Sequence, residues 1–135
     1  MKKTLMIVSM VLAQLAFAGA KEEFKLIHTQ DLVALMKQKD AKLAIFDANN
    51  AKTRKKEGVI PGATLLSSYK EYDLKTVLPA DKDSTLVFYC ANTKCMASHE
   101  AAERAVHEGY TNVNVMADGI QGWKKAGQKA DKPAL

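Results

Sequence analysis

The chain contains two cysteines, and both lie at one predicted strand-to-helix junction, in the stretch FYCANTKCMASHEAAERAVHEGY (residues 88–110). Cys90 directly follows an apolar run, and Cys95 precedes a segment of helical composition. The backbone N–H groups of such a loop and the partial positive charge of a helix N-terminus favour bound anions. Because a thiolate is an anion too, this position favours ionisation of Cys90, and the ammonium of Lys94 would assist if it turned toward the loop. The junction therefore predicts a reactive nucleophile at Cys90; the alternative is a small buried apolar residue.

The segments that must position this loop alternate between strand-like and helix-like patterns. We predict strands at 43–47, 63–66, 85–89 and 113–116, and helices at 28–38, 97–108 and 119–127; the run at 85–89 is apolar throughout, as in a central strand. Thr29 is the expected N-cap of the first helix, Asp31 lies in its first turn, and Gly109 is the expected left-handed residue after the second. Alternating strands and helices indicate an α/β domain with a parallel sheet. Ligands bind beyond the carboxyl ends of such strands, where Asp47 and Cys90 both fall.

The N-terminus has the layout of a secretory signal peptide. Lys2 and Lys3 precede an apolar run from Leu5 to Ala18, and small residues follow. A membrane-spanning helix is the alternative, but this run is shorter than the roughly 20 residues that a bilayer core requires. We therefore expect a signal peptide at 1–20 and one domain at 21–135, in a periplasmic or secreted protein without a stable membrane anchor.

The charge distribution gives no sign of a nucleic-acid partner. The formal charge of +5 falls to +3 without Lys2 and Lys3, and the densest basic cluster, AKTRKKEG at 51–58, has no aromatic residue for stacking on bases. We interpret the cluster as the solvated face of a helix that retains a weak attraction for small anions. The polar segment at 124–135 is expected to fray.

Four stretches resemble those of the rhodanese-like sulfurtransferases, in the same order and spacing as in that family. They are FDANN at 46–50, GVIPGATLL at 58–66, FYC at 88–90 with the loop after it, and GYTNVNVMADGIQGWKKAG at 109–127. The resemblance extends from about Phe24 to Gly127. It implies a parallel five-stranded sheet flanked by helices, in agreement with the pattern of segments.

The resemblance also implies a two-step transfer of sulfur without a cofactor. The Cys90 thiolate would attack the sulfane sulfur of a small anionic donor such as thiosulfate, and the persulfide would pass its sulfur to a thiol or to cyanide. The amides of the loop would bind the donor and stabilise developing charge. This loop comprises Ala91, Asn92, Thr93, Lys94, Cys95 and Met96, with Lys94 as an anion binder. Asp47 and Trp123 also match family positions, but we favour a cap and a core aromatic for them.

The chain departs from the family pattern at several positions. Ala91 and Thr93 replace an arginine and a glycine that are common in the loop, Asn49 stands where an arginine is frequent, and Val59 replaces a histidine. These differences lower the expected efficiency with thiosulfate. Related phosphatases and arsenate reductases have a longer loop that ends in arginine, so Met96 argues against phosphoryl transfer.

Cys95 is the most informative departure. In an oxidising compartment a Cys90–Cys95 disulfide is a natural state, provided that the loop brings the sulfurs together. Cys95 is then a candidate resolving thiol that attacks a Cys90 persulfide and releases sulfide, or the pair exchanges with a redox partner protein. The alternatives are a Cys95 without chemistry, a Cu(I) or zinc site that uses both cysteines with Met96 and His99, and an inactive fold that serves as a binding module.

Overall fold

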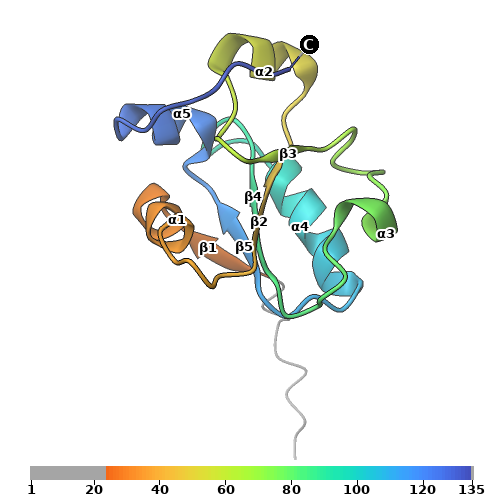
Figure 1. The fold of residues 1–135 in the computed structure, drawn as a ribbon. Helices are drawn as coiled ribbons and strands as arrows, with labels where there is room; N and C mark the ends of the chain where they lie inside the picture. The colour runs from red at the N-terminus through yellow and green to blue at the C-terminus, as the bar shows by residue number, and fades with distance from the viewer. Residues whose placement is uncertain (1–23, 135) are drawn as a thin grey trace, which may run out of the picture.

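The computed structural model describes residues 24–134, so the predicted signal peptide at 1–20 lies outside the described residues. Its centre is a parallel five-stranded sheet with the order β1-β5-β4-β2-β3 (Figure 1). The strands are β1 (Lys25–Ile27), β2 (Leu43–Asp47), β3 (Thr64–Leu65), β4 (Thr85–Tyr89) and β5 (Val113–Met116). The predicted α/β class and its parallel five-stranded sheet are thus confirmed. The pattern of segments had identified every strand except β1, which is short and pairs only with β5.

Helices cover both faces of the sheet. They are α1 (Thr29–Met36), α2 (Ala51–Glu57), α3 (Leu74–Val77), α4 (Ala97–His107) and α5 (Gly119–Lys125). Figure 1 shows α1 and α5 on one face of the sheet, α3 and α4 on the other, and α2 at one end of the molecule. Among residues 24–134, no helix is long and apolar enough to cross a membrane.

The central strand β4 supplies side chains to both hydrophobic layers. Leu86 and Phe88 lie in the layer under α4, whereas Val87 and Tyr89 lie in the layer under α1 and α5. All four are buried completely. Because successive residues of a strand point to opposite faces, a strand covered on both sides must be apolar throughout. This explains why the uninterrupted run before Cys90 correctly predicted a central strand.

Two predictions about helix ends have opposite outcomes. Gly109 follows α4 with φ +99°, as expected for a left-handed C-terminal residue. The prediction of Thr29 as the N-cap of α1 is wrong, because His28 caps the helix. Thr29 instead donates from its backbone N and its hydroxyl to Asp118 Oδ2, at 2.8 Å and 3.1 Å. Thr29, which the local sequence predicts to be the cap, therefore binds the carboxylate of Asp118, a residue distant along the chain.

The prediction that the C-terminal segment frays is also wrong, at least as far as Asp131. The backbone N–H of Val59 donates to the carbonyl of Asp131, and the reverse bond also forms, both at 2.8 Å. Gly58 lies close to the same carbonyl. The polar composition of this segment predicted fraying, but its backbone pairs with Val59, which follows α2.

Candidate active site

The loop between β4 and α4 carries both cysteines. Cys90 follows β4 directly and is 1% exposed, and Met96 is the N-cap residue of α4. Cys90 and Cys95 form a disulfide across a Cα–Cα distance of 6.2 Å. The Sγ of Cys90 lies 3.2 Å from the hydroxyl of Ser98, which belongs to the first turn of α4. The pairing of the two sulfurs, which the sequence left open, is therefore present at the carboxyl end of a central strand.

In this disulfide state the loop uses part of its own hydrogen-bonding capacity. The backbone N of Lys94 donates to Asn92 Oδ1 at 3.0 Å, and that of Cys95 donates to the Asn92 carbonyl at 3.1 Å. The side chains of Thr93, Lys94 and Met96 are exposed, and Met96 reaches 57%. The predicted anion cradle stays a prediction, since two of its amides donate within the loop here.

The start of α5 fixes the other side of the loop. The backbone N of Ile120 donates to the Cys90 carbonyl at 2.8 Å, and that of Gln121 donates to the Ala91 carbonyl at 3.0 Å. This close approach requires Gly119, because a Cβ there would lie 2.5 Å from the carbonyl carbon of Ala91, and its φ is +66°. Sequence reasoning did not assign this role, although the glycine lies within the stretch that carries the family resemblance.

We call the two hydrogen bonds from Ile120 and Gln121 to the cysteine loop the clamp. Asp118, the residue before α5, connects this clamp to α1. It accepts the two hydrogen bonds from Thr29, and its Oδ1 lies 3.3 Å from His28 Nδ1. Burial alone would raise the pKa of Asp118, but the hydrogen bonds from Thr29 and His28 outweigh it and lower the pKa below its ordinary value. The ionised carboxylate therefore holds the beginnings of two helices together. Sequence reasoning gave no role to either His28 or Asp118.

A cavity of about 320 Å³ opens beside the disulfide. Its lining residues are Ala48, Asn49, Asn50, Thr53, Ser67, Ser68, Tyr69, Ala91, Cys95 and Ala97. None of them carries a charged side chain. Asn49 is almost fully buried, and its Nδ2 has no hydrogen-bond partner among residues 24–134. The cavity reaches Cys95 but not Cys90.

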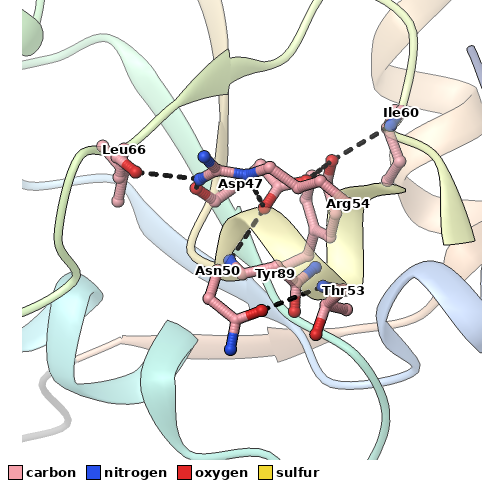
Figure 2. A network of polar contacts seen from close by, with 8 residues as sticks. Asp47, Asn50, Thr53, Arg54, Ile60, Leu66 and Tyr89 are labelled. Atoms are coloured by element: carbon pink, nitrogen blue, oxygen red, sulfur yellow. Dashed lines mark hydrogen bonds and ion pairs between the residues drawn. The ribbon is translucent and has the colours of Figure 1, made fainter. Parts of the chain in front are cut away.

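At the neighbouring strand end, Asp47 is the centre of a buried polar network (Figure 2). Its Oδ1 accepts from the backbone N of Asn49 at 2.8 Å and from Arg54 Nε at 3.1 Å, and its Oδ2 accepts from the Tyr89 hydroxyl at 2.6 Å. Arg54 also donates to the carbonyls of Asp47 and Leu66, each at 2.8 Å. We expected Asp47 to cap a helix or a turn, and it caps the turn that leads into α2, whereas Asn50 is the N-cap of the helix itself.

This network corrects the interpretation of the basic cluster at 51–58. The segment does form α2, and its lysines lie mostly toward solvent, but the Arg54 side chain is only 12% exposed and pairs with a fully buried Asp47. A buried carboxylate requires a counter-charge, and α2 supplies it. Tyr89 completes the network by accepting from the backbone N of Ile60 at 3.0 Å, and burial, together with the charge of Asp47, raises the pKa of its hydroxyl. The contacts of Asp47 are thus with other groups of the protein, which indicates a structural role.

Two further residues singled out from the sequence have clear positions. Trp123 is a core residue, as predicted, and its Nε1 donates to the Lys129 carbonyl at 2.9 Å. His99 packs edge-on against Phe24, with ring centroids 5.3 Å apart. In the described part of the chain no three His, Cys, Asp or Glu side chains gather as metal ligands, and the paired cysteines offer no thiolate in this state. The Cu(I) or zinc alternative gains no support from this arrangement.

A comparison with protein families matches residues 28–126 to the model of the rhodanese-like domain. The match covers most of the chain, and the fold and the cysteine loop agree with it. The protein belongs to the rhodanese-like domain family. A comparison with curated proteins found no match.

Solved structures agree on the fold. A protein of Bacillus halodurans, BH2092, is 20% identical with a TM-score of 0.67, over 81% of this chain and 77% of its own. A thiosulfate sulfurtransferase of Pseudomonas aeruginosa is 21% identical with a TM-score of 0.67, over 82% of this chain but 21% of its own. A rhodanese-like domain protein of Staphylococcus aureus is 24% identical with a TM-score of 0.56, over 74% of this chain and 91% of its own. At these identities the similarity establishes the fold alone.

Proposed function

We propose that the protein is a sulfurtransferase that carries a sulfane sulfur on Cys90 and passes it to a thiol acceptor or to cyanide. The observation that carries the proposal is the position of Cys90 Sγ. It lies beyond the carboxyl end of a central strand, at the N-terminal turn of α4, and 3.2 Å from the Ser98 hydroxyl. A helix N-terminus and a hydroxyl donor both favour a thiolate over a thiol. The family membership and the fold of the Pseudomonas thiosulfate sulfurtransferase support the same activity.

The proposed chemistry starts from the reduced form of the site. The Cys90 thiolate attacks the outer sulfur of thiosulfate, a sulfur–sulfur bond forms, and sulfite leaves with the electron pair of the broken bond. Cyanide or a thiolate then attacks the terminal sulfur of the persulfide and regenerates the Cys90 thiolate. If Cys95 attacks the inner sulfur of the persulfide instead, hydrosulfide leaves and the Cys90–Cys95 disulfide forms. The disulfide is thus a natural end state of the same reaction.

The test uses reduced, desalted protein that is exposed to thiosulfate and then to cyanide. We expect the intact mass to increase by one sulfur and thiocyanate to be released after cyanide is added. Cys90→Ser should abolish both signals. Cys95→Ser should retain the transfer and should accumulate more persulfide, because the resolving thiol is missing. An unchanged mass in wild type and in Cys95→Ser would rule out thiosulfate as the donor and would contradict the proposal if polysulfide also failed.

The disulfide favours one second candidate, a thiol-disulfide redox module that exchanges electrons with a partner protein. The two cysteines are paired and one of them borders a cavity, as exchange with an external thiol requires. Loss of two hydrogens in the wild type on oxidation, without any gain of sulfur from any donor, would favour this candidate. Export to the periplasm or beyond remains part of the proposal, and sequencing the N-terminus of the protein from its host tests it.

A further inference from the structure

The two sulfurs of the disulfide have different surroundings. Cys90 is 1% exposed, lies in the hydrophobic layer under α4, and contacts Ser98. Cys95 packs against the same layer, but it is partly exposed and lines the cavity of about 320 Å³. An external nucleophile opens a disulfide by approaching one sulfur opposite the sulfur that leaves. Of the two residues, Cys95 lines a cavity from which such a nucleophile could approach, whereas Cys90 does not.

The environment of Cys90 suits a leaving group. The departing sulfur becomes a thiolate, and a lower thiol pKa makes it leave faster. The hydroxyl of Ser98 and the first turn of α4 stand beside Cys90 Sγ and stabilise a negative charge there. Access and charge stabilisation therefore assign the two sulfurs different roles in the same reaction.

We propose that the cavity beside Cys95 is the entry site for a thiol that opens the disulfide, with Cys95 Sγ as the attacked atom and Cys90 as the leaving thiolate. The incoming thiolate forms a bond to Cys95 Sγ, and the electron pair of the broken sulfur–sulfur bond goes to Cys90. A second thiol then attacks the external sulfur of the mixed disulfide and releases Cys95 as a thiolate. The site gains two electrons and the two thiols become a disulfide. This inference rests on the proposed function, since it supplies the free Cys90 that sulfur transfer requires.

The cavity also indicates which class of thiol enters. Its polar groups are uncharged amides and hydroxyls, such as those of Asn49, Ser67 and Thr53, and alanines from three segments add apolar surface. Lys94, although it belongs to the loop, does not line it. Asn49 lines the cavity, and its Nδ2, which has no hydrogen-bond acceptor among residues 24–134, is a donor that matches a carbonyl oxygen. This wall fits a cysteine flanked by peptide groups better than a sulfur oxyanion, which a cation would be expected to hold. The ligand class is therefore a cysteine-containing peptide segment.

The first test maps the attacked sulfur. Oxidised full-length protein is mixed with N-acetylcysteine amide, quenched in acid after short times, alkylated with N-ethylmaleimide and digested for mass spectrometry. We expect the adduct on Cys95 and the alkyl group on Cys90, in at least ten-fold excess over the reverse pattern. An adduct found mainly on Cys90 would overturn the proposal.

The second test blocks the cavity, and it decides the matter even if the mixed disulfide is too short-lived to map. Ser67→Trp places a bulky ring at an exposed lining position, and Lys70→Trp does so at an exposed position of the same segment that does not line the cavity. We expect N-acetylcysteine amide to open the disulfide at least ten-fold more slowly in Ser67→Trp and at an unchanged rate in Lys70→Trp. Equal rates in wild type and Ser67→Trp would refute the cavity as the entry site.

A third test compares the rates at which N-acetylcysteine amide and sulfite open the disulfide. Each rate is divided by the rate at which the same reagent opens 2-hydroxyethyl disulfide in solution, which corrects for the intrinsic reactivity of the reagent. We expect the normalised rate of the uncharged thiol to exceed that of sulfite at least five-fold, and the opposite order would refute the ligand class. Failure of the two proposals is distinguishable. Pre-reduced protein that takes no sulfur refutes the sulfurtransferase. If pre-reduced protein takes sulfur but the disulfide of a separate oxidised sample opens by attack at Cys90, only the entry site is refuted.

Discussion

The carboxyl ends of β2 and β4 lie side by side, because Asp47 and Tyr89 are partners in the sheet register, yet the residues beyond them behave in opposite ways. The last residue of β2, Asp47, forms a buried ion pair with Arg54, and both of its carboxylate oxygens accept hydrogen bonds. After β4 comes a loop whose two cysteines exist in a form that an external thiol or a reductant changes. The end of β2 is therefore held in one arrangement, which we call the fixed side. The loop after β4 can change its covalent state, and we call it the variable side.

The comparison teaches that a polar residue at such a strand end is not by itself a catalytic group. Asp47 accepts from a backbone amide, a guanidinium and a phenol, so little capacity is left for a substrate. The Sγ of Cys90 has one polar contact among the described residues, with the Ser98 hydroxyl, and a covalent bond that can open. The two positions differ in whether neighbouring atoms already satisfy the hydrogen-bonding capacity of the side chain.

The largest expected effect comes from removing the counter-charge on the fixed side. Arg54→Ala leaves Asp47 buried and unpaired, and we expect a loss of about 3–5 kcal/mol in the free energy of unfolding, measured with urea. Lys55→Ala, at an exposed position of the same helix, should change it by less than about 0.5 kcal/mol. Similar values for the two variants would mean that the Asp47 network does not stabilise the fold.

Gly119→Ala tests how the variable side is held. The new Cβ would meet the Ala91 carbonyl group at a positive φ, so we expect a loss of about 2–4 kcal/mol together with weaker thiocyanate release. Gly62→Ala is the matched control, because Gly62 also has a positive φ but no atom within 4 Å of the place that a Cβ would occupy. It should cost only the backbone strain, about 1–2 kcal/mol, and leave the activity of the folded protein intact. If both variants lost activity equally, the clamp would have no specific role.

Reduction of the disulfide should have a smaller effect on stability. The loop closed by Cys90 and Cys95 is short, so its chain-entropy contribution is about 2 kcal/mol. We expect urea unfolding of the wild type to shift by that amount when a reductant is present. The double variant Cys90→Ser with Cys95→Ser should be insensitive to the reductant, and a comparable shift in that variant would assign the effect to something other than the disulfide.

The smallest expected effect concerns Asp118, which holds α1 to the clamp. Because hydrogen bonding lowers the pKa of Asp118 in the folded state, its stabilisation is present above its ordinary pKa of 3.8 and is lost as the pH falls through the folded-state value. Asp118→Asn should cost about 1 kcal/mol at neutral pH and progressively less in acid. Asp40→Asn, at an exposed position, serves as the control. A cost for Asp118→Asn that did not shrink from neutral pH down to about pH 2 would contradict the assigned role of its charge.

The sequence was most informative where local signals coincide with the fold. The apolar run before Cys90 needs two covered faces, so it predicted both a central strand and the position of the cysteine loop. The run at Leu43–Asp47 and the glycine after α4 were predictable for the same local reasons. Two cysteines in one short loop made a Cys90–Cys95 disulfide a natural state in an oxidising compartment, but only the structure shows that the two sulfurs pair.

The features that sequence reasoning missed depend on partners that are distant along the chain. The burial of Arg54 follows from acceptors on Asp47 and Leu66, and nothing in AKTRKKEG distinguishes it from its lysine neighbours. A signal was nevertheless present, because a carboxylate that ends a buried strand implies a cation nearby. Strand β1 is mostly exposed and has no apolar run, so only its pairing with β5 identifies it as a strand.

The clamp on the cysteine loop also has a consequence for the order in which the chain is made. Domains fold as their segments emerge during synthesis, N-terminal segments first. Cys90 and Cys95 precede β5 and α5, so a partly synthesised chain presents both thiols before the amides of Ile120 and Gln121 exist to hold the loop. Strand β1 must wait as well, since within the described residues it pairs with β5 alone. The last strand and the last helix of the domain thus complete both the sheet and the hold on the cysteine loop, so the proposed sulfur transfer at Cys90 would require them to be in place.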